Sequence, residues 1–376
     1  MRRVDFAVVG GGMAGVSIGF ELAAHGSVVV MEREPMLAAH TTGRSAAAFI
    51  ESYGGPVVRA LTRASRASFD AAPEVLGTPQ LLSPRPFLWV GGREQGDAVR
   101  GLVESVGTSD VELLDLDQAF SLCPALSPDY LDAAAVDTGA MDIDVMALHQ
   151  GYVGGLARRG ASVLRSAPLR NLQKSGHSWK LVAGEEEIEA NAIVNAAGAW
   201  ADQVAGMAGL PQLGLRPLRR TIAICTGTRL DDISAWPLVA DVSEQFYFKP
   251  ESSQHILVSP ADETPTEPTD ARPLDEDIAL GIDRVNEATT LRLRHVRAAW
   301  AGLRTFAPDR SPVVGYDPEE EGFFWFAGQG GYGIQMAPAL ARLGASLATG
   351  SLQADDLVEQ GVSAGAVGVA RLRQGH

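Results

Sequence analysis

The chain has 376 residues but only two cysteines, Cys123 and Cys225. Two isolated cysteines exclude a disulfide framework and a cysteine-rich zinc site, and they fit a reducing cytoplasm. The seven histidines are scattered and include no HExxH pattern, so we expect no metal site. Positive charge is also scarce. The 31 basic residues face 46 acidic ones, and the net charge of −15 argues against a nucleic-acid partner.

The chain also lacks a continuous apolar run of the length that a membrane-spanning helix needs. The longest uncharged stretch, residues 322–341, contains five glycines, two glutamines and Pro338, so we expect a strand, a turn and a helix there. The first residues resemble a signal peptide, but Asp5 and a glycine cluster interrupt the apolar run. We therefore expect a cytoplasmic protein without an integral membrane segment.

What remains is an ordinary globular composition, with 46% hydrophobic and 20% charged residues. The length suggests about two domains. Apolar runs predict strands at 87–90, 161–164, 221–226 and 245–248. Helical periodicity is present at 58–69, 144–159 and 277–287. Proline-rich segments at 73–86 and 261–277 are expected to be loops.

The strongest motif lies at the start of the chain, where a strand at 4–9, a helix at 16–25 and a strand at 27–32 predict a βαβ unit. The first turn reads Gly10-Gly11-Gly12-Met13-Ala14-Gly15, a GxGxxG pattern. Gly10 permits the tight turn, Gly12 lets a pyrophosphate approach, and Gly15 packs helix on strand. Glu32 ends the second strand, where a carboxylate accepts hydrogen bonds from a ribose. This context predicts a dinucleotide site.

Three further segments favour FAD over NAD. Residues 41–47 follow the second strand and offer hydroxyls and small side chains. Residues 193–200 form a strand that ends in small residues, and residues 323–335 predict a strand, a glycine turn and the start of a helix. A helix N-terminus that faces the flavin pyrimidine would stabilise the negative charge that reduction places there.

These segments resemble the D-amino acid oxidase, glycine oxidase and sarcosine oxidase superfamily of flavoproteins and, within it, the bacterial FAD-dependent D-arginine dehydrogenases. The resemblance extends nearly from end to end. Its most specific pieces are TGRSAA at 42–47, VNAAGAW at 194–200, WAGLR at 300–304 and QGGYGIQ at 329–335. It implies an amino acid dehydrogenase or oxidase, which converts an amino acid to an imino acid that water hydrolyses to the 2-oxo acid and ammonia.

The resemblance also implies the architecture. We expect an α/β fold with a discontinuous, Rossmann-like FAD-binding domain and an inserted α+β substrate domain that contains a large mixed sheet. The FAD-binding domain is predicted to comprise residues 1–52, 141–214 and 300–376, and the substrate-binding domain residues 53–140 and 215–299. The sarcosine oxidases attach their flavin through a cysteine near the segment that is 304–312 here. No cysteine lies in that segment, so we expect noncovalent FAD.

The cofactor contacts implied by the motifs and the resemblance come from the βαβ unit, the three flavin segments and two further positions. They are Gly10, Gly12, Met13, Ala14, Gly15, Glu32, Arg33, Thr41, Thr42, Gly43, Arg44, Ser45, Ala46, Ala47, Leu169, Ala197, Gly198, Trp200, Gly302, Gly330, Gly331, Tyr332, Gly333, Ile334 and Gln335.

The resemblance assigns the substrate contacts one residue at a time. Arg304 matches the arginine that forks the substrate carboxylate, and Arg220 matches a second arginine facing it. Tyr53 and Tyr247 match tyrosines that hydrogen-bond the carboxylate or cover the substrate. Gly331 would offer its carbonyl to the substrate amine. An exposed arginine, core packing of the tyrosines and a simple glycine turn are the structural alternatives for these residues.

Two departures bear on the substrate side chain. The D-arginine enzymes carry a histidine where this chain has Ala48, and a glutamate for the guanidinium where this chain has Phe87. Both changes make the distal pocket more apolar, so we expect an apolar D-amino acid to be preferred over D-arginine. A displaced loop that buries Phe87 in a core is the alternative.

The sequence leaves three functions open. The first is oxidative deamination of a D-amino acid by hydride transfer from Cα to flavin N5, with no side chain certain to act as a catalytic base. The second is oxidation of an N-alkyl amino acid or a 2-hydroxy acid, and the third is a non-catalytic FAD-binding interaction protein. Besides the substrate, the expected partner is an electron acceptor, either oxygen, a quinone or another carrier. We expect a monomer or a small homo-oligomer.

Overall fold

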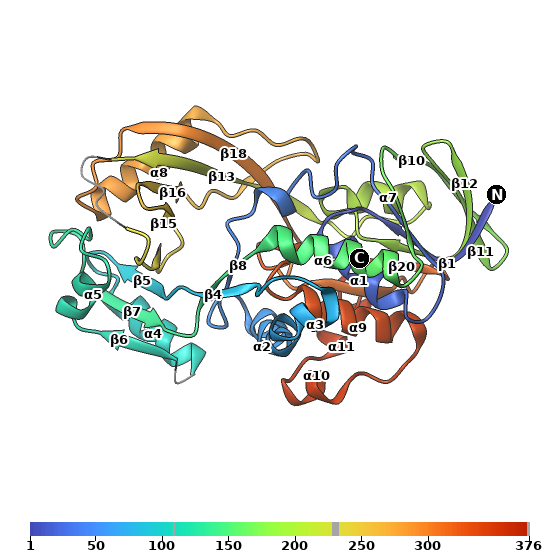
Figure 1. Cartoon of the computed structure of the whole chain (residues 1–376), viewed down its shortest axis with the longest axis horizontal. Helices are drawn as coiled ribbons and strands as arrows, with labels where there is room; N and C mark the ends of the chain where they lie inside the picture. Colours follow the sequence, from blue (N-terminus) through green and yellow to red (C-terminus); the bar gives the residue numbers. More distant parts are fainter. Residues whose placement is uncertain (108–109, 228–232, 374–376) are drawn as a thin grey trace.

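The computed structural model describes residues 1–107, 110–227 and 233–373. In these residues the strands form one sheet of eight strands, one of ten and one of three. The eight-stranded and ten-stranded sheets lie in two lobes side by side along the long axis of the molecule (Figure 1). The three-stranded sheet, formed by β3 (Ala48–Phe49), β8 (Met141–Ile143) and β4 (Leu82–Pro84), belongs to the region between them.

The eight-stranded sheet is built around parallel strands. β1 pairs in parallel with β2 and β12, β2 with β9, and β12 with β20, while β10, β11 and β19 add antiparallel pairs. The strands are β1 (Arg2–Val9), β2 (Val28–Met31), β9 (Ser162–Leu164), β10 (Leu169–Ser175), β11 (Ser178–Ala183), β12 (Glu186–Asn195), β19 (Val313–Tyr316) and β20 (Phe323–Ala327).

Both faces are covered in the central part of this sheet, which explains why β2 and β20 are continuous apolar runs. Val8 and Phe324 pack on one face with helices α1, α6 and α9, whereas Val9 and Trp325 pack on the other face with α7. The helices of this lobe are α1 (Met13–Leu22), α2 (Pro56–Asp70), α3 (Ala72–Leu76), α6 (Val145–Arg158), α7 (Ala201–Met207), α9 (Ala337–Thr349), α10 (Asp355–Glu359), α11 (Ala364–Val367) and α12 (Ala370–Arg373), with 3-10 turns η1 (Thr42–Arg44) and η2 (Gly198–Trp200).

The ten-stranded sheet is mixed, as predicted, because β14 pairs in parallel with β5 while the other pairs are antiparallel. It consists of β5 (Phe87–Gly91), β6 (Val111–Leu114), β7 (Ala133–Asp137), β13 (Arg216–Thr226), β14 (Leu238–Asp241), β15 (Tyr247–Ser252), β16 (His255–Ser259), β17 (Thr264–Pro265), β18 (His295–Phe306) and β21 (Gln329–Gly330). Its helices are α4 (Gly96–Val106), α5 (Leu116–Leu122) and α8 (Asp275–Ala288).

One short segment connects the two large sheets directly. The chain leaves β20 of the eight-stranded sheet at Ala327 and two residues later joins the ten-stranded sheet as β21. There Gly330 pairs with Thr305 and Gln329 with Phe306. In α/β folds, ligands bind at the carboxyl ends of the parallel strands. Because β21 directly follows β20, this crossing places the end of β18 next to that edge of the eight-stranded sheet.

The structure corrects two expectations about local structure. Residues 73–86 are not all loop, since they include most of helix α3 and strand β4. Pro73 is compatible with α3 because proline is tolerated in the first helical turn. The helix expected to start within 331–335 begins only at Ala337. Residues 329–336 form β21 and a turn, a backbone path that Gly330, Gly331 and Gly333 permit.

The domain boundaries remain a proposal. Residues 53–140 were assigned to the substrate domain, yet α2 and α3 within that range make contacts with α9 and α6 of the eight-stranded lobe. The boundary at residue 300 falls inside β18, a single strand of the ten-stranded sheet. A division between the two large sheets therefore follows the packing better than these residue numbers do.

Candidate active site

The turn from β1 to α1 depends on glycine at two positions. Gly10 has a φ of 112°, and a Cβ there would lie 2.5 Å from the carbonyl oxygen of Ala196, which follows the neighbouring strand β12. A Cβ at Gly15 would lie 1.8 Å from the carbonyl oxygen of Gly10. The close packing of helix on strand predicted for Gly15 is therefore present. The N-cap residue of α1 is Gly12, which has no side chain that could bond to the helix.

The peptide group of Gly11 is held from both sides. Its N–H donates to Glu32 Oε2 (2.8 Å), and its carbonyl accepts from His149 Nε2 (2.9 Å). Glu32 Oε1 accepts from the Glu34 N–H (2.9 Å), yet a carboxylate offers about four acceptor positions, so it can accept further donors. Burial lowers the pKa of His149, which keeps its imidazole neutral near pH 7.

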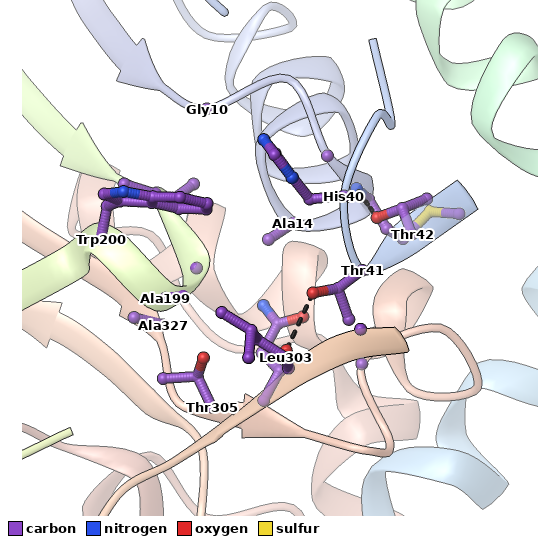
Figure 2. A pocket seen from close by; sticks show the side chains of 18 of the residues that line it. Gly10, Ala14, His40, Thr41, Thr42, Ala199, Trp200, Leu303, Thr305 and Ala327 are labelled. Atoms are coloured by element: carbon purple, nitrogen blue, oxygen red, sulfur yellow. Dashed lines mark hydrogen bonds between the residues drawn. The ribbon is translucent and has the colours of Figure 1, made fainter. Parts of the chain in front are cut away.

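A long cavity begins at this turn and follows the edge of the eight-stranded sheet to β18 (Figure 2). In Figure 2, Gly10 and Ala14 mark the glycine turn and α1, while Leu303 and Thr305 mark β18 on the opposite side. Two neighbouring threonines connect the two sides, because the Thr41 hydroxyl donates to the Leu303 carbonyl (2.8 Å) and the Thr42 hydroxyl accepts from the Met13 N–H (3.0 Å).

Most of the predicted cofactor residues line this cavity. They are Gly10, Gly12, Met13, Ala14, Glu32, Arg33, Thr41, Thr42, Arg44, Ser45, Ala46, Leu169, Ala197, Gly198, Trp200, Gly302, Gly330, Gly331, Gly333 and Ile334. Gly15, Gly43, Ala47, Tyr332 and Gln335 are not part of its lining. Gly15 acts through packing, and Ala47 and Gln335 line the adjoining cavity described below.

At one end of the cavity, aromatic and cationic side chains gather. The His40 and Trp200 rings have centroids 4.9 Å apart, and the Arg33 guanidinium lies 5.3 Å from the Trp200 ring. Arg44 lines the cavity, but its guanidinium donates to the carbonyls of Ala271 (2.8 Å) and Ala301 (3.0 Å). We infer that Arg44 orders the cavity wall more than it contacts a ligand.

A second cavity continues from the first. Arg220, Tyr247, Arg304, Gly331 and Ile334 line both, together with Ser45 and Ala46, so the two spaces are joined. The predicted substrate residues all line the second cavity: Ala48, Tyr53, Phe87, Arg220, Tyr247, Arg304 and Gly331. Residues from β3, β5, β13, β15, β18 and the turn after β21 thus meet at one place between the two lobes.

Arg304 sits at the junction of the two cavities. It lies beside Tyr53, with which it interacts electrostatically, and a Cβ added at Gly331 would lie 2.7 Å from its Nη1 atom. Although burial opposes the charge, the adjacent Tyr53 and Tyr247 hold the pKa of Arg304 above its ordinary value. Burial raises the pKa of Tyr53, so at neutral pH a charged guanidinium lies beside a protonated hydroxyl. Both groups can donate hydrogen bonds to an anion.

Arg220 is buried and held by its own set of acceptors. Its Nε donates to the Asp262 carbonyl (2.9 Å), and its Nη2 lies 3.4 Å from Glu263 Oε1. Arg310 also bonds Glu263, at 3.0 and 2.8 Å. Burial opposes the charge of Glu263, but the two arginines still lower its pKa. Glu263 is therefore shared, which leaves Arg220 able to face a further anion in the cavity.

The far wall of the second cavity is apolar. Phe87 and Trp89, two residues apart on β5, lie with ring centroids 4.4 Å apart, and Leu238 and Ala240 of β14 lie beside them. Phe87 is buried in a hydrophobic cluster and also lines the cavity, and its role toward a substrate stays a prediction. Among the described residues that line the second cavity, Glu244 is the acidic one. It lies in the turn from β14 to β15 and is exposed.

Sequence reasoning missed several lining residues. His40, Gln203, Thr305 and Gln329 line the first cavity, and Trp89 and Glu244 line the second. Trp89 could have been found, because residues two apart on a strand share a face and Phe87 was already a candidate. Glu244 gave no signal, since only the turn between β14 and β15 brings it to the pocket.

The lining fits a flavin dinucleotide on independent grounds. Four polar atoms of residues that line the first cavity are buried and have no hydrogen-bond partner within the described chain: His40 Nδ1, Tyr247 Oη, Thr305 Oγ1 and Gln329 Nε2. Buried polar groups without partners are rare, so they indicate groups that a ligand satisfies. The glycine turn, the start of α1 and the Glu32 carboxylate supply the phosphate and ribose contacts that a dinucleotide needs.

Comparison with known proteins gives the class. The sequence profile described as "DAO: FAD dependent oxidoreductase" matches residues 5–347, and the chain belongs to this family. The predicted superfamily, fold class and FAD cofactor are confirmed, as is the class of FAD-dependent oxidoreductase, whereas the resemblance to the D-arginine dehydrogenases in particular stays a prediction.

The particular relatives differ in what they act on. Glycine oxidase of Geobacillus kaustophilus is 26% identical over 95% of this chain and 96% of its own length. Glycerol-3-phosphate dehydrogenase 1 of Mycobacterium tuberculosis is 26% identical over 80% of this chain and 62% of its own length. FAD-dependent oxidoreductase domain-containing protein 1 of Bos taurus is 30% identical over 42% of this chain and 35% of its own length. The chain thus spans less than two thirds of the length of the latter two proteins.

Solved structures share the fold. Glycine oxidase from Geobacillus kaustophilus superposes with a TM-score of 0.81 at 22% identity, covering 97% of this chain and 99% of that chain. L-proline dehydrogenase from P. horikoshii gives 0.81 at 20% identity, covering 94% and 96%. L-alpha-glycerophosphate oxidase from Mycoplasma pneumoniae, with FAD bound, gives 0.84 at 17% identity, covering 93% and 95%. In the described residues, no helix is both long and apolar enough to cross a bilayer.

The glycine turn yields a test of the cofactor site. Gly15→Ala should prevent stable FAD loading, because the new Cβ would overlap the Gly10 carbonyl and push α1 away from β1. The measurement is the ratio of 450 nm to 280 nm absorbance of the purified protein. Gly206→Ala in α7, where a Cβ meets nothing within 4 Å, is the matched control and should keep its flavin. A yellow Gly15→Ala protein with normal FAD affinity would contradict this account of the turn.

Proposed function

We propose that this protein oxidatively deaminates a D-amino acid, with an apolar side chain preferred, to the 2-oxo acid and ammonia. The observation that carries the proposal is the pair of arginines, Arg220 and Arg304, at the junction of the flavin cavity with a largely apolar cavity. Two guanidiniums facing one cavity suit a carboxylate. Tyr53 and Tyr247 add hydroxyls, and the Tyr247 hydroxyl is buried without a partner in the described chain, as a ligand-binding group would be.

The substrate is held by its two polar ends. Its carboxylate binds Arg304 and Tyr53 on one side and Arg220 and Tyr247 on the other, and its amine faces the Gly331 carbonyl. This orientation directs Cα toward the first cavity and the side chain toward Phe87. Bound FAD supplies the two-electron acceptor for the hydride that leaves Cα. The resulting imino acid takes up water and yields the 2-oxo acid and ammonia.

The lining offers little for general base catalysis. Of the described residues around the second cavity, Glu244 is the acidic one and none is a histidine. Glu244 is exposed, and Ala48 stands where the D-arginine enzymes have histidine. The substrate must therefore lose its ammonium proton before hydride transfer, so that the nitrogen lone pair can stabilise the developing cation. No side-chain base is required for this step.

Three finer features belong to the proposal. FAD is held noncovalently, because residues 304–312 contain no cysteine and both cysteines are buried in the ten-stranded lobe. The reduced cofactor passes its electrons to oxygen, a quinone or another carrier. N-alkyl amino acids, as in the dimethylglycine dehydrogenase of Mus musculus that matches 90% of this chain, are the alternative substrate class.

Removing the main carboxylate partner tests the site. Arg304→Ala should lower kcat/KM, and the decrease should correspond to a loss of about 2–5 kcal/mol in transition-state binding, because the buried carboxylate loses its charged partner. The FAD content should stay unchanged. Arg216→Ala, at an exposed position on the adjacent strand β13, is the control. A kcat/KM for Arg304→Ala within a few-fold of wild type would show that the carboxylate binds elsewhere.

The pH dependence follows from the protonation states. We expect kcat/KM to rise with pH as the substrate amine deprotonates. Tyr53 should not cause a fall below pH 10, because burial raises its pKa and keeps the hydroxyl a donor. Initial rates between pH 6 and pH 10 test this. An additional low pKa that disappears in Glu244→Gln would show that an enzyme carboxylate acts as the base.

The preferred substrate side chain depends on whether apolar contact with Phe87 or charge pairing with Glu244 contributes more to binding. Burying a leucine side chain stabilises binding by about 2 kcal/mol, whereas pairing a cation with an exposed carboxylate contributes at most about 1 kcal/mol. A guanidinium against Phe87 and Trp89 would also lose hydration. We expect kcat/KM for D-leucine to exceed that for D-arginine, and Phe87→Glu to shift the ratio toward D-arginine.

Glu244→Gln separates the two contributions in the same assay. It should lower kcat/KM for D-arginine by less than about fivefold and leave D-leucine unchanged, because the carboxylate is exposed. A wild-type preference for D-arginine that Glu244→Gln abolishes would refute the apolar pocket and assign the specificity to Glu244.

A further inference from the structure

We propose that Asp137 is a positioning residue for substrate recognition, acting through Ser52 to place Tyr53 beside Arg304. This inference rests on the proposed function, since it concerns how the carboxylate site is assembled. Asp137 lies at the end of β7 and does not line either cavity.

Tyr53 stands on a short connection between β3 and α2, and two residues just before it are anchored. The Ile50 N–H donates to Gln335 Oε1 (3.3 Å). The Ser52 hydroxyl donates to Asp137 Oδ2 (2.5 Å). The Tyr53 N–H itself donates to the Ile50 carbonyl (3.3 Å) and closes a turn. The position of Tyr53 is therefore set by one contact to each lobe.

The carboxylate of Asp137 is suited to this task because both groups that hydrogen-bond to it are donors. Its Oδ2 accepts from the Ser52 hydroxyl and its Oδ1 accepts from the Gly139 N–H (3.0 Å), while the nearby Asp110 is a like charge. An amide at this position would direct its NH₂ group toward one of these donors. Both Asp137 and Ser52 are 3% exposed, so donors left without an acceptor would remain unsatisfied.

Pure fold stability does not explain an acid at this place. Burial raises the pKa of Asp137, which means that the surroundings disfavour its charge even with the Ser52 hydroxyl and the Gly139 N–H donating to it. Buried ionised groups commonly contribute less to stability than apolar residues of similar volume. The carboxylate instead holds the Ser52–Tyr53 peptide in place against the ten-stranded lobe.

The sheet makes this location relevant to the substrate. Asp137 is the direct partner of Phe87 in the β5–β7 pair, so the residue that anchors Ser52 is in register with a wall of the second cavity. Tyr53 then packs against Phe87, Trp89 and Tyr332, with ring centroids 6.4, 6.1 and 5.1 Å away. These rings fix the orientation of the tyrosine once its backbone is anchored.

The experiment is a double-mutant cycle between Asp137→Ala and Tyr53→Phe. Two dissociation constants are measured for each variant. One is that of the preferred amino acid, from the concentration dependence of anaerobic flavin reduction in a stopped-flow instrument. The other is that of anthranilate, an unreactive carboxylate, from changes in flavin absorbance at equilibrium. Thr138→Ala, at the exposed neighbouring position, is the matched control.

We expect each single variant to raise both dissociation constants about tenfold, and the limiting rate of flavin reduction to stay within about threefold, because a ground-state contact is lost. The double variant should bind no more weakly than Tyr53→Phe alone, because Asp137 acts through that tyrosine. Ser52→Ala should reproduce Asp137→Ala. It replaces that variant in the cycle if the latter does not fold.

Additive losses, or an Asp137→Ala variant altered only in melting temperature, would overturn the inference and leave Asp137 a structural residue. If no amino acid reduces the flavin, the proposed function fails, and the anthranilate arm still decides whether Asp137 acts through Tyr53. If wild type binds neither amino acids nor anthranilate, both proposals fail.

Discussion

A guanidinium without an acidic partner is the constraint on which the site depends. Within the described chain, no carboxylate lies within ion-pair distance of Arg304, although Arg220, Arg219 and Arg310 all have one. The adjacent Tyr53 is neutral at pH 7, because burial raises its pKa, so it does not compensate the charge of Arg304. A cation held in this way at the junction of two cavities favours an incoming anion, and the substrate carboxylate is that anion in our account.

The two lobes exist to bring this cation and the cofactor together. The eight-stranded sheet supplies the glycine turn at the carboxyl end of β1, where a dinucleotide meets backbone N–H groups. The ten-stranded sheet supplies the arginines on β13 and β18, adjacent strands in which Arg220 pairs with Gly302. The crossing from β20 to β21 connects the two sheets through a single residue, Gly328.

The sequence predicted the parts of the site that depend on local geometry. The glycine turn, Glu32 and the segments around residues 42, 198 and 331 could be recognised because close backbone packing restricts which residues fit. The substrate residues came from the resemblance, and all of them line one cavity. Glu244 and Asp137 could not be foreseen, because a turn and a strand pairing distant in sequence place them. The loop expected at 73–86 contains β4, whose pairing with β8 is likewise nonlocal.

The most direct test of the account is anaerobic mixing of the purified protein with a panel of paired D- and L-amino acids, together with glycine, sarcosine and 2-hydroxy acids, while flavin absorbance at 450 nm is followed. Bleaching by apolar D-amino acids, with little by their L-enantiomers, is the predicted result. Bleaching confined to N-methyl amino acids or 2-hydroxy acids would contradict the substrate class. An oxidised spectrum with every carboxylate in the panel would contradict the central claim that the Arg304 site binds a substrate for oxidation.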